Sequence, residues 1–124
     1  MTEPSLDLAL NAARAADAKG ATDIVVLHVG PVVAICEYFV VVSASNDRQV
    51  RAVVDSVEEA IRLDRDESPR SVEGADARRW VLLDYGDVVI HVFHRDEREY
   101  YRLERLYRDA EAVAWPADGQ RSAG

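Results

Sequence analysis

Two histidines at the end of an apolar segment, His91 and His94, are the residues whose types and spacing first point to metal binding. In an extended strand, side chains three positions apart point to opposite faces of the sheet, so these two imidazoles would not converge. A zinc site needs three or four converging ligands, and no other histidine or cysteine lies near this pair in the sequence. We therefore predict no metal site and no cofactor.

A nucleophile with a nearby base is the second arrangement to consider, because Cys36 is the only cysteine and His28 lies a little before it. No segment around Cys36 has the pattern of a catalytic nucleophile, and a lone cysteine flanked by apolar residues is usually a small core residue. We therefore interpret Cys36 as a core residue and not as a catalytic nucleophile.

Two further segments have side chains or amides that could hold an ion. Ser43-Ala44-Ser45 precedes a predicted helix, whose first backbone amides can bind an anion. A phosphate loop would have glycines and usually a lysine, so we interpret this segment as a helix cap. Asp84 and Asp87 are three positions apart around a predicted turn and do not share a face, so Asp87 is interpreted as a turn residue.

Length and composition favour one globular domain. The chain has 124 residues, of which 48% are apolar and 31% charged, and we predict a single domain over residues 1–115 and a disordered polar tail over residues 116–124. A single cysteine excludes an intrachain disulfide and fits a reducing compartment. Residues 1–10 lack the pattern of a signal peptide or presequence, and the longest apolar run, residues 38–42, is too short to span a bilayer. These features predict a cytoplasmic protein with no membrane partner.

The net charge of −8 comes from 15 basic and 23 acidic residues. Nucleic acid is bound mainly by neutralising phosphates with lysine and arginine, so this chain is a poor candidate for a sequence-specific nucleic-acid reader. A basic protein surface is a better match, because opposite charge speeds encounter. The alternative is that the acidity serves solubility alone.

Apolar periodicity and turn residues predict an α/β fold with the order α-β-β-α-β-β-β-α. Its clearest helix carries one buried stripe, formed by Val50, Val53, Val54, Val57 and Ile61. A strand–helix–strand succession in the middle of the chain implies a crossover within one sheet. We therefore expect a mixed five-stranded sheet with flanking helices, over residues 6–19, 23–29, 38–43, 47–63, 70–72, 80–85, 88–93 and 97–110.

The segments 80–85 and 88–93 are separated only by Gly86-Asp87, which predicts a tight hairpin. Its register would pair Trp80 with Phe93 and Leu82 with His91, and would sort the side chains onto two faces. One face is almost wholly apolar. The other, called here the Trp80 face, consists of Trp80, Leu82, Asp84, Val89, His91 and Phe93.

The Trp80 face is too apolar for plain solvent exposure and too polar for an ordinary core. Aromatic anchors with a few polar groups are typical of binding surfaces, so a partner protein is one interpretation. The other is that the last helix covers this face, with His91 and Asp84 bonded to each other or to water.

Several segments together resemble the ribosomal silencing factors, also called the Iojap-related family. The most specific are WVLLDYGDVVIHVF at residues 80–93 and EREYYRLERL at residues 97–106. Matching pieces occur earlier, as DIVVL at 23–27, EYFVVVS at 37–43, RQV at 48–50 and EG at 73–74. The resemblance runs from about Leu6 to Tyr107.

This resemblance implies a nucleotidyltransferase-like fold without the transferase active site, and therefore a protein that has no catalytic residues and is not an enzyme. It also implies a function: binding the large ribosomal subunit through its universal protein fourteen, blocking the small subunit sterically, and so repressing translation when nutrients are short. Several family members form homodimers, which implies a homodimer as a further assembly.

We expect the Trp80 face and the start of the last helix to form the surface that docks on the ribosomal protein. We call this surface the docking patch, and it consists of Trp80, Leu82, Asp84, Asp87, His91, Glu97, Arg98, Tyr100 and Tyr101. Within it, the aromatic and leucine side chains would be apolar anchors, the acids would meet basic side chains, and His91 and Arg98 would add hydrogen bonds. The alternatives are a nucleotide-binding enzyme of nucleotidyltransferase type and a homodimeric scaffold that uses the Trp80 face on itself.

Overall fold

The structure is a computed structural model and describes residues 4–32, 36–100 and 108–115. Three helices and six strands follow one another in these ranges. In chain order they are α1 (Pro4–Ala18), β1 (Thr22–His28), β2 (Tyr38–Ala44), α2 (Asp47–Arg65), β3 (Ser71–Glu73), β4 (Trp80–Asp84), β5 (Val88–His94), α3 (Arg95–Tyr100) and β6 (Glu111–Val113). Among the described ranges, no helix is long and apolar enough to cross a membrane.

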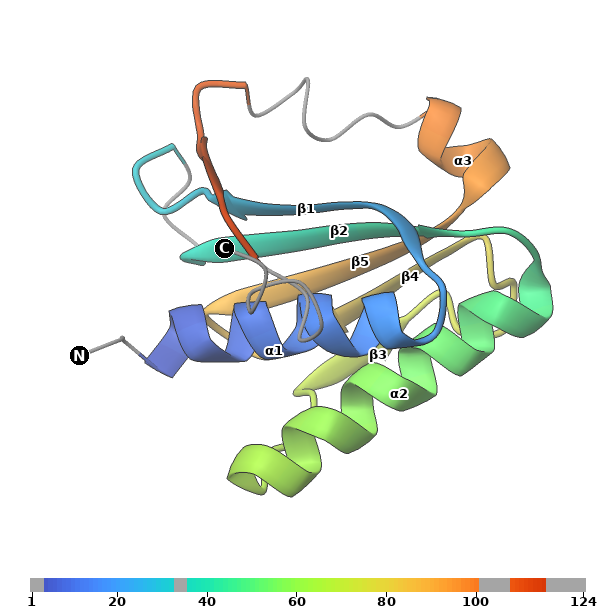
Figure 1. Ribbon diagram of the computed structural model, residues 1–124, viewed down its shortest axis with the longest axis horizontal. Helices are drawn as coiled ribbons and strands as arrows, with labels where there is room; N and C mark the ends of the chain where they lie inside the picture. Colours follow the sequence, from blue (N-terminus) through green and yellow to red (C-terminus); the bar gives the residue numbers. More distant parts are fainter. Residues whose placement is uncertain (1–3, 33–35, 101–107, 116–124) are drawn as a thin grey trace, which may run out of the picture.

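The strands form one open mixed sheet with the order β3-β4-β5-β2-β1-β6. The β2–β5 pair is parallel, as the predicted crossover requires, and the other four pairs are antiparallel. The α/β class and the mixed sheet are confirmed, but the predicted number of five strands is wrong because β6 adds a sixth. Figure 1 shows α1 and α2 together on one face of this sheet.

The strand β6 also corrects the predicted end of the last helix. Residues 97–110 were expected to be helical, whereas residues 108–110 form a turn and bend before β6, which pairs with the outer edge of β1. Tertiary contacts explain the difference: Trp115 donates from Nε1 to the backbone oxygen of Ile24 at 3.1 Å, and Val113 packs against the main core. Pairing also satisfies the backbone groups along the β1 edge. Leu103, Leu106 and Tyr107, predicted for the apolar side of that helix, lie outside the described residues.

The helix α2 forms as its sequence predicts. Asn46 is its N-cap and accepts a hydrogen bond from the backbone N–H of Gln49 at 2.8 Å. It ends at Asp66, whose left-handed backbone closes the last turn onto Arg62. The predicted apolar stripe is buried throughout, which fixes the helix against the sheet: Val50, Val53, Val54, Val57 and Ile61.

Two apolar clusters lie on opposite faces of the sheet. The larger one is formed by α1, α2 and the strand residues that face them, such as Val40, Val81 and Ile90. The smaller one lies on the other face and includes Phe39 and Phe93, with Trp80 and others packed at its border. The Trp80 face therefore belongs to the smaller cluster.

Candidate functional site

The β4–β5 hairpin holds the Trp80 face in the predicted register. Trp80 pairs with Phe93, Leu82 with His91 and Asp84 with Val89. Gly86 in the turn has φ +90°, a conformation that costs glycine little. The carboxylate of Asp84 accepts from the Gly86 N–H at 2.8 Å, which stabilises the turn from inside.

Exposure on the Trp80 face increases from the middle of the sheet toward β4. Phe93 and His91 on β5 are buried, whereas Trp80, Leu82 and Asp84 on β4 are each half-buried. β5 lies between β4 and the seven-residue β2, whereas β4 is flanked on its other side only by the three-residue β3. The β5 residues His91 and Phe93 of this face are therefore part of the core, and its β4 residues reach the surface.

Trp80 is fixed in position by two contacts with β5. Its indole Nε1 donates to His91 Nδ1 at 3.1 Å. Its ring stacks on Phe93 with centroids 4.8 Å apart. The expected contact between His91 and Asp84 is replaced by this indole–imidazole bond. An aromatic side chain that is both half-exposed and rigid loses little entropy on binding a partner.

His91 is the most strongly perturbed base on this face. Burial lowers the pKa of His91 to about 4, because the charged ring would lose its hydration. The ring is therefore neutral at pH 7, and since Nδ1 accepts from Trp80, the proton belongs on Nε2. Nε2 is buried without a hydrogen-bond partner in the described part of the chain. His91 thus supports Trp80 from beneath and is not itself a surface contact.

Three carboxylates gather at the turn end of the Trp80 face. Burial raises the pKa of the Cys36 thiol to about 11, and the negative charges of Asp84, Glu37 and Asp87 add to this effect. The backbone oxygen of Asp87 accepts from the N–H groups of Glu37 and Tyr38 at 2.8 and 3.0 Å. Asp84 and Asp87 were predicted for the docking patch from the sequence. Glu37 was not, and its carboxylate lies 3.3 Å from His28 Nε2. Its place depends on the parallel β2–β5 pairing, which aligns Tyr38 with Val88.

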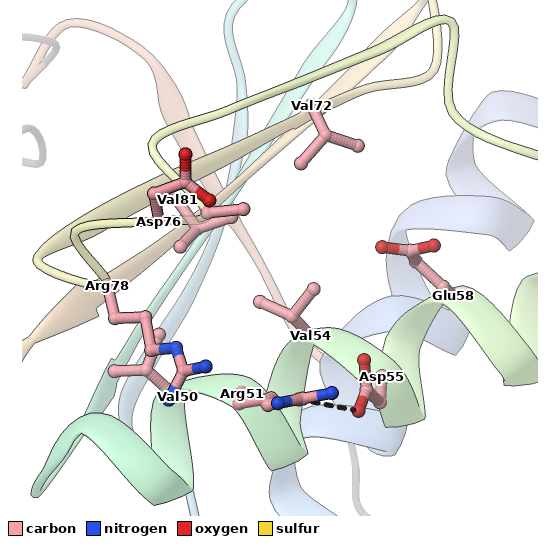
Figure 2. A pocket seen from close by; sticks show the side chains of 10 residues that line it. Val50, Arg51, Val54, Asp55, Glu58, Val72, Asp76, Arg78 and Val81 are labelled. Atoms are coloured by element: carbon pink, nitrogen blue, oxygen red, sulfur yellow. Dashed lines mark ion pairs between the residues drawn. The ribbon is translucent and has the colours of Figure 1, made fainter.

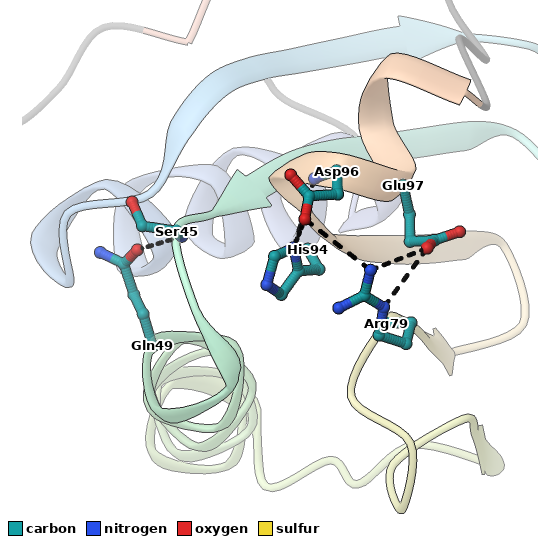
Figure 3. Close-up of polar contacts among 6 residues, drawn as sticks. All are labelled: Ser45, Gln49, Arg79, His94, Asp96 and Glu97. Carbon is teal, nitrogen blue, oxygen red and sulfur yellow. Dashed lines mark hydrogen bonds and ion pairs between the residues drawn. The ribbon is translucent and has the colours of Figure 1, made fainter.

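The two polar residues of α3 that were predicted for the docking patch have partners within the chain. Arg98 is buried and donates from Nη1 to Ser43 Oγ at 2.9 Å. Glu97 accepts from Arg79, with Arg79 Nη2 at 3.1 Å from its Oε1, as Figure 3 shows. Arg98 therefore positions α3 on the sheet. The side chain of Tyr100 and the whole of Tyr101, both predicted for the docking patch, lie outside the described residues.

The segment before α2 is occupied by its own cap. The Ser45 N–H donates to the Gln49 side-chain oxygen at 2.6 Å, a contact also drawn in Figure 3. Gln49 in turn donates its own N–H to Asn46. Two amides that an anion would need are therefore already bonded, which agrees with the interpretation of this segment as a helix cap.

The two histidines that were considered for a metal site have other surroundings in the ranges that the structure describes. They contain no group of three or more His, Cys, Asp or Glu side chains arranged to hold a metal ion. His94 accepts from the Asp96 N–H at its Nδ1, at 3.2 Å, so it caps α3, whereas His91 is buried beside Trp80.

Comparison with known proteins gives one consistent family. The family model described as "Ribosomal silencing factor during starvation" matches residues 2–123. The ribosomal silencing factor of Bacillus subtilis is 42% identical over 102 residues, which cover 80% of this chain and 83% of that protein. The corresponding factor of Halalkalibacterium halodurans is 40% identical over 108 residues, covering 87% and 89%. The chloroplastic Iojap protein of Zea mays is 34% identical over 118 residues, 94% of this chain and 50% of that protein.

Two solved structures have the same fold. A crystal structure of a Chromobacterium violaceum protein superimposes with a TM-score of 0.80 at 26% identity, covering 91% of this chain and 92% of that one. A crystal structure of a Bacillus halodurans protein superimposes with a TM-score of 0.71 at 35% identity, covering 88% and 95%. The likeness therefore extends over the sheet and its flanking helices.

Proposed function

Because this chain belongs to the ribosomal silencing factor family, we propose that it binds the large ribosomal subunit and sterically keeps the small subunit from joining it. The family consists of ribosome-associated regulators of translation, and its names describe regulation and not catalysis. The contact on the ribosome would be the universal large-subunit protein fourteen, and the role would be to repress translation when nutrients are limiting. A cytoplasmic location goes with this role.

The observation that supports a docking patch on the Trp80 face is the rigid, half-exposed indole of Trp80. Tryptophan is enriched among the residues that contribute most to binding at protein interfaces. The half-buried Leu82 lies two positions along the same strand and on the same face, so the two form an apolar centre. An interface of standard size would cover this centre and its surroundings, roughly 800 Å² per partner.

The carboxylates at the turn would make the docking patch negatively charged. Asp84 and Asp87 lie at the hairpin turn, Glu37 is joined to Asp87 through the backbone, and Asp87 is exposed. The Glu37 carboxylate lies 3.3 Å from His28 Nε2, so a partner would share it with that imidazole. A basic protein surface would be attracted to them, and such attraction raises the rate of encounter more than the final affinity. Glu97 is already paired with Arg79, so its contribution to a partner would require sharing or exchange of that ion pair.

The nucleotide-binding enzyme is the less favoured alternative. The amides at the start of α2 are bonded to the helix's own cap, and the relatives are named as silencing factors. Thermal stabilisation by a nucleotide with Mg²⁺ would support that alternative, because a ligand at 100 times its Kd adds about 2.7 kcal/mol to stability.

Co-sedimentation with separated ribosomal subunits on sucrose gradients tests the proposal. The wild-type protein should travel with large subunits, and Trp80→Ala should weaken that binding by more than about 1 kcal/mol, or roughly fivefold. Leu63→Ala is the matched control, since it removes an apolar side chain that is 69% exposed on α2. Migration with small subunits alone, or with neither, would refute the role. Unchanged binding of a folded Trp80→Ala protein would remove Trp80 from the docking patch.

A further inference from the structure

A groove of about 340 Å³ lies on the opposite face of the sheet from Trp80, between α2 and the β3–β4 region. Its floor is apolar and is formed by Val50 and Val54 of α2 and Val81 of β4. In Figure 2 these valines lie between the helix on one side and the strand on the other. The groove therefore lies along the border between α2 and the outer strands β3 and β4.

Charged side chains line the groove along its length. Arg78 and Asp76 lie at the end near the β3–β4 loop, and Glu58 lies at the other end, as Figure 2 shows. Between them, Arg51 and Asp55 of α2 form an ion pair with each other at 3.8 Å. Neither the Arg78 guanidinium nor the Glu58 carboxylate has an ion pair or side-chain hydrogen bond within the described ranges. Burial, with Asp55 nearby, raises the pKa of Glu58. Both groups are half-buried, so both are already partly desolvated. A ligand group of opposite charge would contact each of them in that state.

The backbone holds Arg78 at its end of the groove under strain. Arg78 has φ +54°, which is uncommon for a residue with a side chain, and its N–H bonds to the Gly74 oxygen at 3.1 Å. Gly74 is required at the start of this loop, because a Cβ there would clash with the backbone oxygen of Trp80. Strain of this kind is common where a side chain is held for binding.

The strand β3 borders the groove and forms one edge of the sheet. All three of its residues are exposed, and among the described elements only β4 pairs with it. Val72, in the middle of β3, lines the groove and is 41% exposed. An edge strand with an exposed apolar residue is a template for pairing with another extended chain.

We propose that the outer edge of β3 binds an extended peptide segment of a partner protein as a seventh strand. The segment would run antiparallel to β3 and place an acidic, an aliphatic and a basic side chain at alternate positions facing the groove. The acid would pair with Arg78, the aliphatic side chain would cover Val72, and the basic side chain would pair with Glu58. Main-chain hydrogen bonds would give affinity, and the alternate side chains would give specificity.

The observations favour a strand over the other occupants of such a groove. An amphipathic helix needs a broad apolar surface, but the floor valines are nearly covered and only Val72 is well exposed. Alternate strand residues are about 7 Å apart, so three of them extend over roughly 14 Å along the edge.

This inference does not rest on the proposed ribosomal role. The groove and the docking patch lie on opposite faces, so occupation of one leaves the other free, and each can be tested in the absence of the other. Failure of one binding test therefore says nothing against the other.

A fluorescently labelled synthetic peptide with Asp, Ile and Lys at alternate positions and Thr between them is the probe. We expect it to bind the full chain, with slowed backbone hydrogen exchange at residues 71–73. Arg78→Gly should weaken binding roughly tenfold, the effect of one charge-assisted bond. The fold should be kept, because glycine suits the left-handed conformation of that position. Arg95→Ala, which removes an exposed arginine from α3, is the matched control and should bind normally.

A charge-swap experiment tests whether the acidic residue of the peptide pairs with Arg78. A peptide with Lys in place of its Asp should bind the wild-type protein weakly and regain affinity for the Arg78→Glu variant. Absence of binding at about 1 mM peptide would overturn the proposal. So would a bound peptide that is helical, binding without protection of residues 71–73, or a concentration-dependent dimer of the protein that forms through Val72.

Discussion

Trp80 donates a hydrogen bond from its indole Nε1 to Nδ1 of His91, at 3.1 Å, across the β4–β5 hairpin. One residue is half-exposed and the other is buried, so the bond connects the surface of the Trp80 face to its interior. The imidazole can accept this bond only while Nδ1 carries no proton. The position of the proposed anchor therefore depends on the protonation state of a residue beneath it.

Acid should destabilise the protein through His91. Its pKa is about 4 in the folded state against an ordinary value of 6.5, so the unfolded chain binds the proton more tightly. The contribution of His91 to stability is therefore complete above pH 6.5 and is lost as the pH falls toward 4. The loss should be on the order of 3 kcal/mol. Urea unfolding at several pH values should show this slope in wild type and a shallower one in His91→Gln, and equal slopes would contradict the assignment.

Arg98 should contribute to stability although it carries a charge. Its guanidinium is buried and bonds to Ser43, so removal of Ser43 takes away a partner of a buried cation. Ser43→Ala should lower the free energy of unfolding by about 1–3 kcal/mol. Arg95→Ala on the same helix is the control and should change it by less than about 0.5 kcal/mol, because its side chain is exposed. Similar small effects for both variants in denaturant titration would show that the Ser43 contact is unimportant.

The hairpin could be predicted from the sequence, because its information is local. A two-residue turn with glycine, together with apolar runs on both sides, determines the pairing of residues 80–84 with 89–93. The stripe of α2 was equally readable, since helical spacing sorts Val50 to Ile61 onto one side. Both predictions used residues that are close together in the chain.

The features that could not be predicted from the sequence depend on contacts between segments that are far apart in the chain. β6 exists because it finds the edge of β1, and Trp115 reaches Ile24, 91 residues away in the sequence. Arg98 was predicted as a partner contact, yet it bonds to Ser43, 55 residues away. Arginine is rarely buried unless it is paired, and nothing in the local sequence shows that a partner is available. The position of Glu37 beside Asp87 was not predicted for the same reason.

Gly74 and Gly20 provide a matched pair for the strained loop. Both have φ near +80°, but an added Cβ at Gly74 would clash with the backbone of Trp80, whereas at Gly20 it would meet the flexible side chain of Gln49. Gly20→Ala should therefore cost about 1 kcal/mol, and Gly74→Ala should cost at least about 2 kcal/mol because backbone atoms must move. Thermal unfolding of the two variants gives the comparison. Equal costs would mean that the loop adapts without strain.

Cys36 should be unreactive in the folded protein. It is buried, and its pKa of about 11 leaves a thiolate fraction at pH 8 roughly a hundredfold smaller than that of a thiol with the ordinary pKa of 9.0. Labelling with a disulfide reagent should therefore be slow in native buffer and fast in guanidinium chloride. Rapid native labelling would show that the thiol is accessible and would contradict its place in the core.

Asp87 should affect the rate of docking more than its final strength. Its carboxylate is exposed, and the bonds to Glu37 and Tyr38 use its backbone oxygen, so the side chain can be changed without loss of those bonds. Asp87→Lys should slow association with large subunits severalfold at low salt, and the difference should shrink at high salt as screening increases. Asp64→Lys makes the same charge change at an exposed position on α2, away from the docking patch, and so measures the effect of net charge alone. Equal slowing by the two variants in stopped-flow measurements would mean that only the total charge matters, and the carboxylates at the turn would then have no specific part in docking.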